Sequence, residues 1–263
     1  MTDNPYAPPK AAVLEPAAAP IGTYIPDGRK VVASRGVAWY SEAWTLFKGA
    51  PGTWVLICII FAVLWILLSI IPLVSMFLSI VYPVVAAGLM LGCRSIEEGS
   101  GLTVGHLFAG FKKNVGSLLL VGVLYLVGTM LIALFVGIGA ALLIPAIASR
   151  GGFNPSDFGS VMSMLPFILL IALVVMALML PLFMAIWFAP ALVVFHDLAP
   201  MAAMKASFQG SLKNIVPFLL YGVVGVVLGI LAVIPVGLGM LVWIPLLWAS
   251  IYTGYRDIFV KPA

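Results

Sequence analysis

Charged residues are scarce in this chain of 263 residues, and their scarcity excludes a water-soluble protein. Asp, Glu, Lys and Arg together make up 8% of the residues, whereas hydrophobic residues make up 63%. A soluble globular domain is about 25% charged and about 45–50% apolar. Because a polar surface cannot cover so large an apolar excess, the sequence predicts that a lipid bilayer solvates much of the chain. A soluble enzyme is therefore excluded.

Cysteine and histidine are also rare. The two cysteines, Cys58 and Cys93, lie in or beside apolar runs, which excludes a disulfide framework. The two histidines, His106 and His196, have no further ligands at a usable spacing, so we expect neither a metal nor a cofactor. Glu97 precedes His106, but no nucleophile or substrate-orienting group accompanies the pair, and no phosphate-binding or nucleic-acid motif is present. We expect no catalytic residues and no nucleic-acid partner.

Four long tracts contain no charged residue, and they define the expected membrane helices. The tracts hold 45, 36, 39 and 42 residues and lie between Lys48 and Arg94, Lys113 and Arg150, Asp157 and Asp197, and Lys213 and Arg256. A helix that crosses roughly 30 Å of hydrocarbon needs about 20 apolar residues. Turn residues divide the first and last tracts into two spans each. The prediction is an all-α polytopic membrane protein with six transmembrane helices, which cover residues 53–71, 76–93, 116–147, 161–195, 215–233 and 238–255.

The two middle tracts are too short for two comfortable spans, so each is predicted to form one long or broken helix. The stretch 161–195 contains Pro166, Pro181 and Pro190, which predict a kink or a break. An alternative with eight spans folds both tracts into hairpins and moves Arg150 to the side of the termini. Accessibility of the loop around Arg150 distinguishes the two topologies.

Basic residues predict the orientation of the chain. With six spans, all 13 Lys and Arg residues except Arg150 fall on the side that carries both termini. Basic residues in short loops collect on the cytoplasmic side of a membrane. Both termini are therefore predicted to be cytoplasmic.

The two ends of the chain differ in composition. Residues 1–33 are rich in proline and alanine and lack an apolar run, which predicts a disordered cytoplasmic tail. Residues 34–263 are predicted to form a single transmembrane domain. Short amphipathic helices are expected just before three of the spans, starting at Ser34, near Leu107 and at Pro200. The expected apolar stripes are Val37, Tyr40, Trp44 and Phe47 in the first helix, and Met201, Met204, Phe208 and Leu212 in the third.

An internal repeat is indicated by matches at a fixed spacing. Four residues recur 100 positions later, Phe108, Gly110, Lys113 and Asn114 as Phe208, Gly210, Lys213 and Asn214. An asparagine at such a position can cap a helix or turn the chain, and a lysine can extend its ammonium to lipid headgroups. Arg94 and Arg256 each lie just past a span, where they can bind lipid phosphate. Lys113, Asn114, Lys213, Asn214, Arg94 and Arg256 are therefore candidates for headgroup contact or simple anchoring.

The interiors of the predicted spans hold polar but uncharged side chains. No span contains Asp, Glu, Lys or Arg away from its ends, which argues against a proton relay. Tyr82, Tyr125 and Tyr221 are candidates to line a polar cavity beside the Pro181–Pro190 segment. The alternative is that these hydroxyls bond to neighbouring backbone and the helices pack solidly.

Several short motifs resemble those of uncharacterised proteobacterial multi-pass inner-membrane proteins. These motifs are Ser34-Arg35-Gly36, the run from Phe188 to Val193, Ala203, Ser207, Lys213-Asn214 and the tail from Ser250 to Phe259. A more distant likeness is to the membrane domain attached to some glycerophosphodiester phosphodiesterases, although nothing here is similar to their catalytic domain. The resemblance implies a location in the bacterial inner membrane. It implies no activity.

Two functional hypotheses follow from these observations. The first is a non-catalytic scaffold or accessory protein of the cell envelope, which binds membrane lipids and, in one version, another membrane protein or a second copy of itself. The second is a passive or weakly coupled transporter or channel for an apolar or zwitterionic solute. A continuous cavity lined by the three tyrosines would favour the second hypothesis.

Overall fold

A computed structural model of the chain describes residues 22–151, 156 and 158–261. These residues form nine α-helices, one 3-10 helix and a two-stranded antiparallel sheet. The elements in chain order are β1 (Thr23–Tyr24), α1 (Arg35–Gly49), α2 (Pro51–Ser69), α3 (Pro72–Glu97), η1 (Val104–Phe111), α4 (Val115–Gly151), α5 (Phe158–Trp187), α6 (Ala189–His196), α7 (Pro200–Lys213), α8 (Ile215–Val233), α9 (Met240–Phe259) and β2 (Val260–Lys261).

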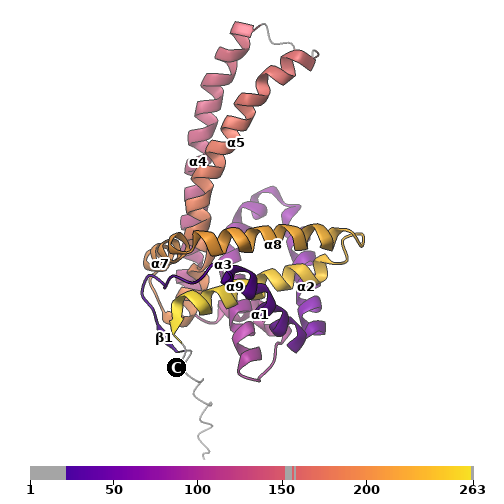
Figure 1. Cartoon of the computed structure of the whole chain (residues 1–263), viewed down its shortest axis with the longest axis vertical. Coiled ribbons are helices and arrows are strands. Elements are labelled where there is room, and N and C mark those ends of the chain that lie inside the picture. The colour runs from indigo at the N-terminus through magenta and orange to yellow at the C-terminus, as the bar shows by residue number, and fades with distance from the viewer. Residues whose placement is uncertain (1–21, 152–155, 157, 262–263) are drawn as a thin grey trace, which may run out of the picture.

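The helices divide into a packed body and a projecting hairpin. In Figure 1, α4 and α5 run side by side away from the other elements, and α8 and α9 lie across their direction. The body holds the core, in which α9 packs against α1, α2, α3 and α8. Its largest fully buried side chains include Trp39, Trp54, Tyr252, Tyr255, Phe188 and Phe259. Aromatic side chains therefore supply much of the packing that holds α9 in place.

Five of the described helical stretches are long and apolar enough to cross a membrane. They cover Pro51–Ser69, Phe77–Glu97, Val115–Leu142, Phe158–His196 and Ile215–Val233. The predicted count of six is therefore not confirmed. The helix that matches the sixth predicted span is α9, and most of its second half is buried inside the protein. Tyr, Thr, Arg and Asp side chains in that half lower its apolar character and contact other helices.

A helix break occurs near the end of the stretch 161–195, at Phe188 between α5 and α6. Pro190 stands in the first turn of α6, where its missing N–H costs no helical hydrogen bond. The hydroxyl of Ser207 accepts the Phe188 N–H at 3.0 Å and donates to the Met184 carbonyl at 2.7 Å. One side chain of α7 thus satisfies both the donor and the acceptor that the break exposes. Pro166 and Pro181 lie inside α5 without ending it.

Part of the N-terminal segment that was predicted to be a disordered tail is bound to the body. Residues 1–21 of the expected tail lie outside the described part of the chain, but residues 22–33 are bound to α9 and β2. β1 pairs with β2, the Ile25 N–H donates to the Phe259 carbonyl, and the Arg29 N–H donates to the Ile258 carbonyl. Main-chain hydrogen bonds of this kind do not depend on side-chain type. They therefore cannot be predicted from the proline-rich and alanine-rich composition of the segment.

The amphipathic helices bury part of each expected stripe, because Tyr40 and Phe47 of α1 and Met204 of α7 are buried inside the protein. In α1, Trp39 and Ala43 are buried, whereas Val37 and Trp44 are exposed. Ser34 makes no side-chain cap. In α7 the buried face consists mainly of small residues, namely Ala203, Met204, Ala206, Ser207, Gly210 and Ser211. Because α1 packs on α8 and α9 and α7 packs on α5, the contact surface follows the neighbouring helix and not the most apolar stripe.

Candidate functional site

A carboxylate near the end of α9 is the centre of one cluster of polar contacts. Asp257 accepts hydrogen bonds from Arg35 Nε at 2.5 Å, from Arg29 Nη2 at 3.1 Å and from Trp39 Nε1 at 3.0 Å. Its side chain is only 9% exposed. Two cations and an indole from the N-terminal segment and α1 therefore converge on one buried anion, which fixes both segments against α9.

A chain of ion pairs continues from Arg35 across the same end of the body. Arg35 also donates to Glu42 at 2.6 Å, and Glu42 accepts from Arg256 at 3.3 Å. Arg256 pairs in turn with Glu97 at the end of α3, and Glu97 accepts from the Tyr252 hydroxyl at 2.7 Å. The network, here called the Asp257–Glu97 network, links the N-terminal segment, α1, α3 and α9.

Electrostatic attraction favours the charged form of Arg35. Partial burial by itself would lower the pKa of Arg35, but hydrogen bonds and attraction from Asp257 and Glu42 outweigh the burial and raise the pKa above its usual value. Burial also raises the pKa of Tyr40, which lies on the buried face of α1. Arg35 therefore stays cationic and Tyr40 neutral, and neither has the shift expected of a catalytic base.

Arg94 and Arg256, two of the candidate headgroup ligands, are already paired with carboxylates. Arg94 donates to Glu98 at 2.5 Å and lies over the ring of Phe195. Arg256 bridges Glu42 and Glu97. The ion pairs of Arg256 therefore join α9 to α1 and α3, whereas Arg94 pairs within its own helix end and reaches α6 through the ring of Phe195.

The two repeated asparagines have related but unequal positions. Each carbonyl oxygen accepts the first helical hydrogen bond of the next helix, from Leu118 to Asn114 and from Phe218 to Asn214. The backbone of Asn114 adopts a left-handed conformation with φ of 54°, whereas Asn214 has φ of −123°. The preceding segments also differ, since η1 is a 3-10 helix and α7 an α-helix. The repeat therefore preserves a helix start but not the conformation around it.

The side chains of these asparagines bind different segments. Asn214 is fully buried, accepts the Val31 N–H at 2.8 Å, and donates to the carbonyls of Arg29 at 2.9 Å and Gly210 at 2.8 Å. Asn114 donates to the Val193 carbonyl at 2.9 Å and to the Asp197 carboxylate at 2.7 Å. Asn214 thus holds the N-terminal segment, and Asn114 holds the end of α6.

The repeated lysines both lie at the surface. Lys113 Nζ is 3.9 Å from the Asp197 carboxylate, and both side chains are exposed. Lys213 Nζ donates to the main-chain carbonyls of Asp27 at 3.0 Å and Gly28 at 3.1 Å. Among the described residues no carboxylate pairs with the Lys213 ammonium, which distinguishes it from Arg94 and Arg256.

The structure brings two of the three candidate cavity tyrosines together. Tyr82 and Tyr125 line a cavity of about 330 Å³ with Trp65, Ser79, Ala86, Met90, Phe183, Ile186, Trp187, Pro190 and Ile251. Tyr221 lies elsewhere. Its ring stacks on Tyr40 with a centroid distance of 4.6 Å, and its hydroxyl is 2.9 Å from that of Ser250. Tyr221 borders a second hollow, of about 430 Å³, which shares Phe183 and Trp187 with the first.

The histidines have local structural partners. The His106 ring contacts Thr103 in a capping box at the start of η1. His196 Nε2 is 2.7 Å from the Tyr255 hydroxyl, and its ring lies against Tyr24. Among residues 22–151, 156 and 158–261, no group of three His, Cys, Asp or Glu side chains is placed to hold a metal ion.

Sequence reasoning missed Arg29, Arg35, Glu42 and Asp257 as a set. The resemblance included Arg35 and Asp257 among its motifs, but they are separated by 222 residues in the chain. One available signal is that both charges lie in predicted amphipathic or terminal segments that also contain aromatic residues. That signal cannot identify a partner.

Comparison with known proteins gives a relative of nearly the same length. The chain is 27% identical over 266 aligned residues to a probable inner membrane protein of Burkholderia thailandensis, and the alignment covers 88% of this chain and 93% of the relative. This chain is a multi-pass membrane protein. No family model and no solved structure matches it, and the likeness to the membrane domain of glycerophosphodiester phosphodiesterases gains no support.

Proposed function

We propose that the chain is a non-catalytic scaffold or accessory protein of the bacterial inner membrane, which binds lipids or another membrane protein through the α4–α5 hairpin. The name of the Burkholderia relative and the apolar helices support the location. The distribution of basic residues supports the further proposal that both termini are cytoplasmic.

The observation that carries the proposal is the wide exposure of apolar side chains along the part of the hairpin that projects from the body. Residues 167–170 of α5 are four consecutive exposed apolar residues, which leaves no protected side of the helix at that point. In α4, Leu131, Leu134, Phe135 and Ile138 are all exposed. Such a surface needs a lipid or protein neighbour, because water would leave it unstable.

The length of α4 adds to this argument. Its 37 residues extend about 55 Å at about 1.5 Å per residue, which exceeds the roughly 30 Å of a bilayer core. The hairpin therefore has apolar length beyond that needed for one crossing. A scaffold can use this surface for contact with a neighbouring apolar helix or with acyl chains.

Site-specific photo-crosslinking tests the scaffold role. A benzoylphenylalanine at Phe135 of α4, which is 65% exposed, is expected to form adducts with a discrete membrane protein or with lipid in intact membranes. The matched control is the same residue at Phe111 of η1, an exposed aromatic site outside the hairpin. Adduct formation at Phe135 no greater than at Phe111, together with a monomer that retains neither protein nor lipid in mild detergent, would contradict the proposal.

The cavity at Tyr82 and Tyr125 favours a second candidate function, the passive passage of a small zwitterionic or apolar solute. Several helices of the body and the base of the hairpin enclose it, and its lining combines hydroxyls with aromatic rings. The position of Tyr221 in a separate hollow weakens this candidate, because the three tyrosines do not line one cavity.

Glycine efflux from proteoliposomes tests passage. If the cavity conducts, efflux is faster than from protein-free liposomes, and Ala86→Phe slows it because the added ring fills the cavity. Ala202→Phe, at an exposed position on α7, is the control that leaves the cavity unchanged. Equal efflux with and without the protein would remove this candidate.

A further inference from the structure

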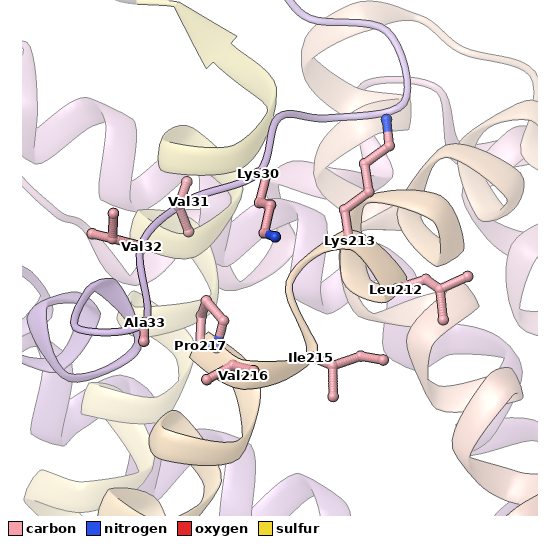
Figure 2. A pocket seen from close by; sticks show the side chains of 9 residues that line it. All are labelled: Lys30, Val31, Val32, Ala33, Leu212, Lys213, Ile215, Val216 and Pro217. Carbon is pink, nitrogen blue, oxygen red and sulfur yellow. The ribbon is translucent and has the colours of Figure 1, made fainter.

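A groove lined by two lysines and by apolar side chains lies where the N-terminal segment crosses the turn between α7 and α8. Its volume is about 580 Å³. Nine residues line it, Lys30, Val31, Val32, Ala33, Leu212, Lys213, Ile215, Val216 and Pro217. Figure 2 shows the side chain of Lys30 extending toward the α7–α8 turn and that of Lys213 extending toward the N-terminal segment.

The lining of the groove carries two positive charges, those of Lys30 and Lys213. None of its nine lining residues carries a carboxylate. Within residues 22–151, 156 and 158–261, Lys30 has no hydrogen bond or ion pair, and Lys213 donates only to carbonyl oxygens. The adjacent Arg29 is different, because it pairs with Asp257. The start of α8 also borders the groove, and a helix N-terminus favours a nearby anion.

The apolar part of the groove continues onto a membrane helix. Leu212, Ile215 and Val216 are exposed at its lower edge. Beyond them, Leu219 and Val223 are exposed along α8, which is one of the five helices of membrane-spanning length. A ligand with an anionic head and an acyl chain could therefore place its head at the lysines and its chain along α8.

We propose that this groove binds the phosphate of an anionic phospholipid, with Lys30 as the principal ligand and Lys213 as the supporting charge. The site is separate from the α4–α5 hairpin and does not depend on the scaffold role. Asn214 supports the site indirectly, because its bonds to Val31 and Arg29 hold the wall that carries Lys30. The apolar edge selects a lipid over free phosphate.

Titration of the full chain in mild detergent with dioctanoyl phosphatidylglycerol tests the proposal. Binding is followed by the rise in unfolding temperature. Lys30→Gln is expected to weaken binding by about fivefold, the effect of losing one exposed charge pair, and added salt should weaken binding of the unaltered protein. Lys30→Arg should retain binding. Because Lys30 has no partner among the described residues, its replacement is expected to leave their packing intact.

Three comparisons make the test decisive. Lys205→Gln removes an exposed lysine of α7 outside the groove and is expected to leave binding unchanged. Dioctanoyl phosphatidylcholine and inorganic phosphate are both expected to bind more weakly than the anionic lipid. The proposal would be overturned if Lys30→Gln bound the anionic lipid as tightly as the unaltered protein, or if Lys205→Gln weakened binding as much as Lys30→Gln. It would also be overturned if inorganic phosphate bound as tightly as the anionic lipid. These outcomes do not depend on whether the hairpin cross-links a partner.

Discussion

Replacing Asp257 with alanine is expected to destabilise the protein by about 3 kcal/mol, because the change leaves two guanidinium groups and an indole N–H without their shared acceptor. This loss of stability is at the lower end of the range for breaking a buried ion pair, because Arg29 and Arg35 are partly exposed. Asp257→Asn keeps one acceptor oxygen but removes the charge. It should therefore destabilise the protein less than alanine does.

Thiol labelling during heating measures this effect, because Cys58 and Cys93 are free and buried and react only when the helices open. The control is Glu98→Gln, which removes a carboxylate that is more exposed than Asp257, 32% against 9%, and that pairs with Arg94 four residues away. A surface pair of this kind contributes about 0.5 kcal/mol. If Asp257→Ala unfolds at the same temperature as Glu98→Gln, Asp257 does not hold the N-terminal segment and α1 against α9.

Asn214→Ala is expected to cost about 3 kcal/mol and to release the N-terminal segment from the body. The change removes three hydrogen bonds from a fully buried side chain and leaves the Val31 N–H without its acceptor. Arg29 and Lys30 belong to the N-terminal segment that the substitution releases. Trypsin should therefore cleave after these two residues about tenfold faster. The measurements are thiol labelling of the buried cysteines and the rate of tryptic cleavage.

The repeat supplies a matched control for this prediction. Asn114→Gly removes the corresponding side chain at a position whose left-handed backbone suits glycine. Its lost bonds go to Val193 and to the exposed Asp197, so a cost of about 1 kcal/mol and no change in cleavage after Arg29 are expected. Equal cleavage of the two variants would show that the segment is held by other contacts.

The repeat illustrates what a residue pattern can and cannot predict. Gly110 and Gly210 match in sequence, and each allows a close contact. A Cβ on Gly110 would lie 1.9 Å from the Val84 carbonyl oxygen, and one on Gly210 would lie 2.4 Å from the Phe259 ring. The requirement for a small residue is therefore shared, although the contacting surfaces belong to α3 in one case and α9 in the other. A residue pattern therefore indicates how large a side chain a position can hold, but it does not indicate which helix packs against that position.

The candidate headgroup residues illustrate the same limit. Lys213 and Arg256 look alike in sequence, since each stands beside an apolar tract with its charge on the predicted cytoplasmic side. Folding places Arg256 between Glu42 and Glu97, whereas in the described part of the chain Lys213 donates to the main-chain oxygens of Asp27 and Gly28. These partners determine whether each cation is available to bind a lipid phosphate, and they come from distant parts of the chain.

The sequence alone determined that lipid solvates this protein, because hydropathy is a property of each tract and needs no knowledge of its neighbours. It also predicted a helix at 215–233, the range that α8 occupies. Only the tertiary structure decided that the second half of α9 is buried within the body, that residues 22–33 bind α9 and β2, and that Asp257 collects two arginines. These features depend on main-chain bonds and on charge pairs hundreds of residues apart, and such contacts exist only once the helices have packed.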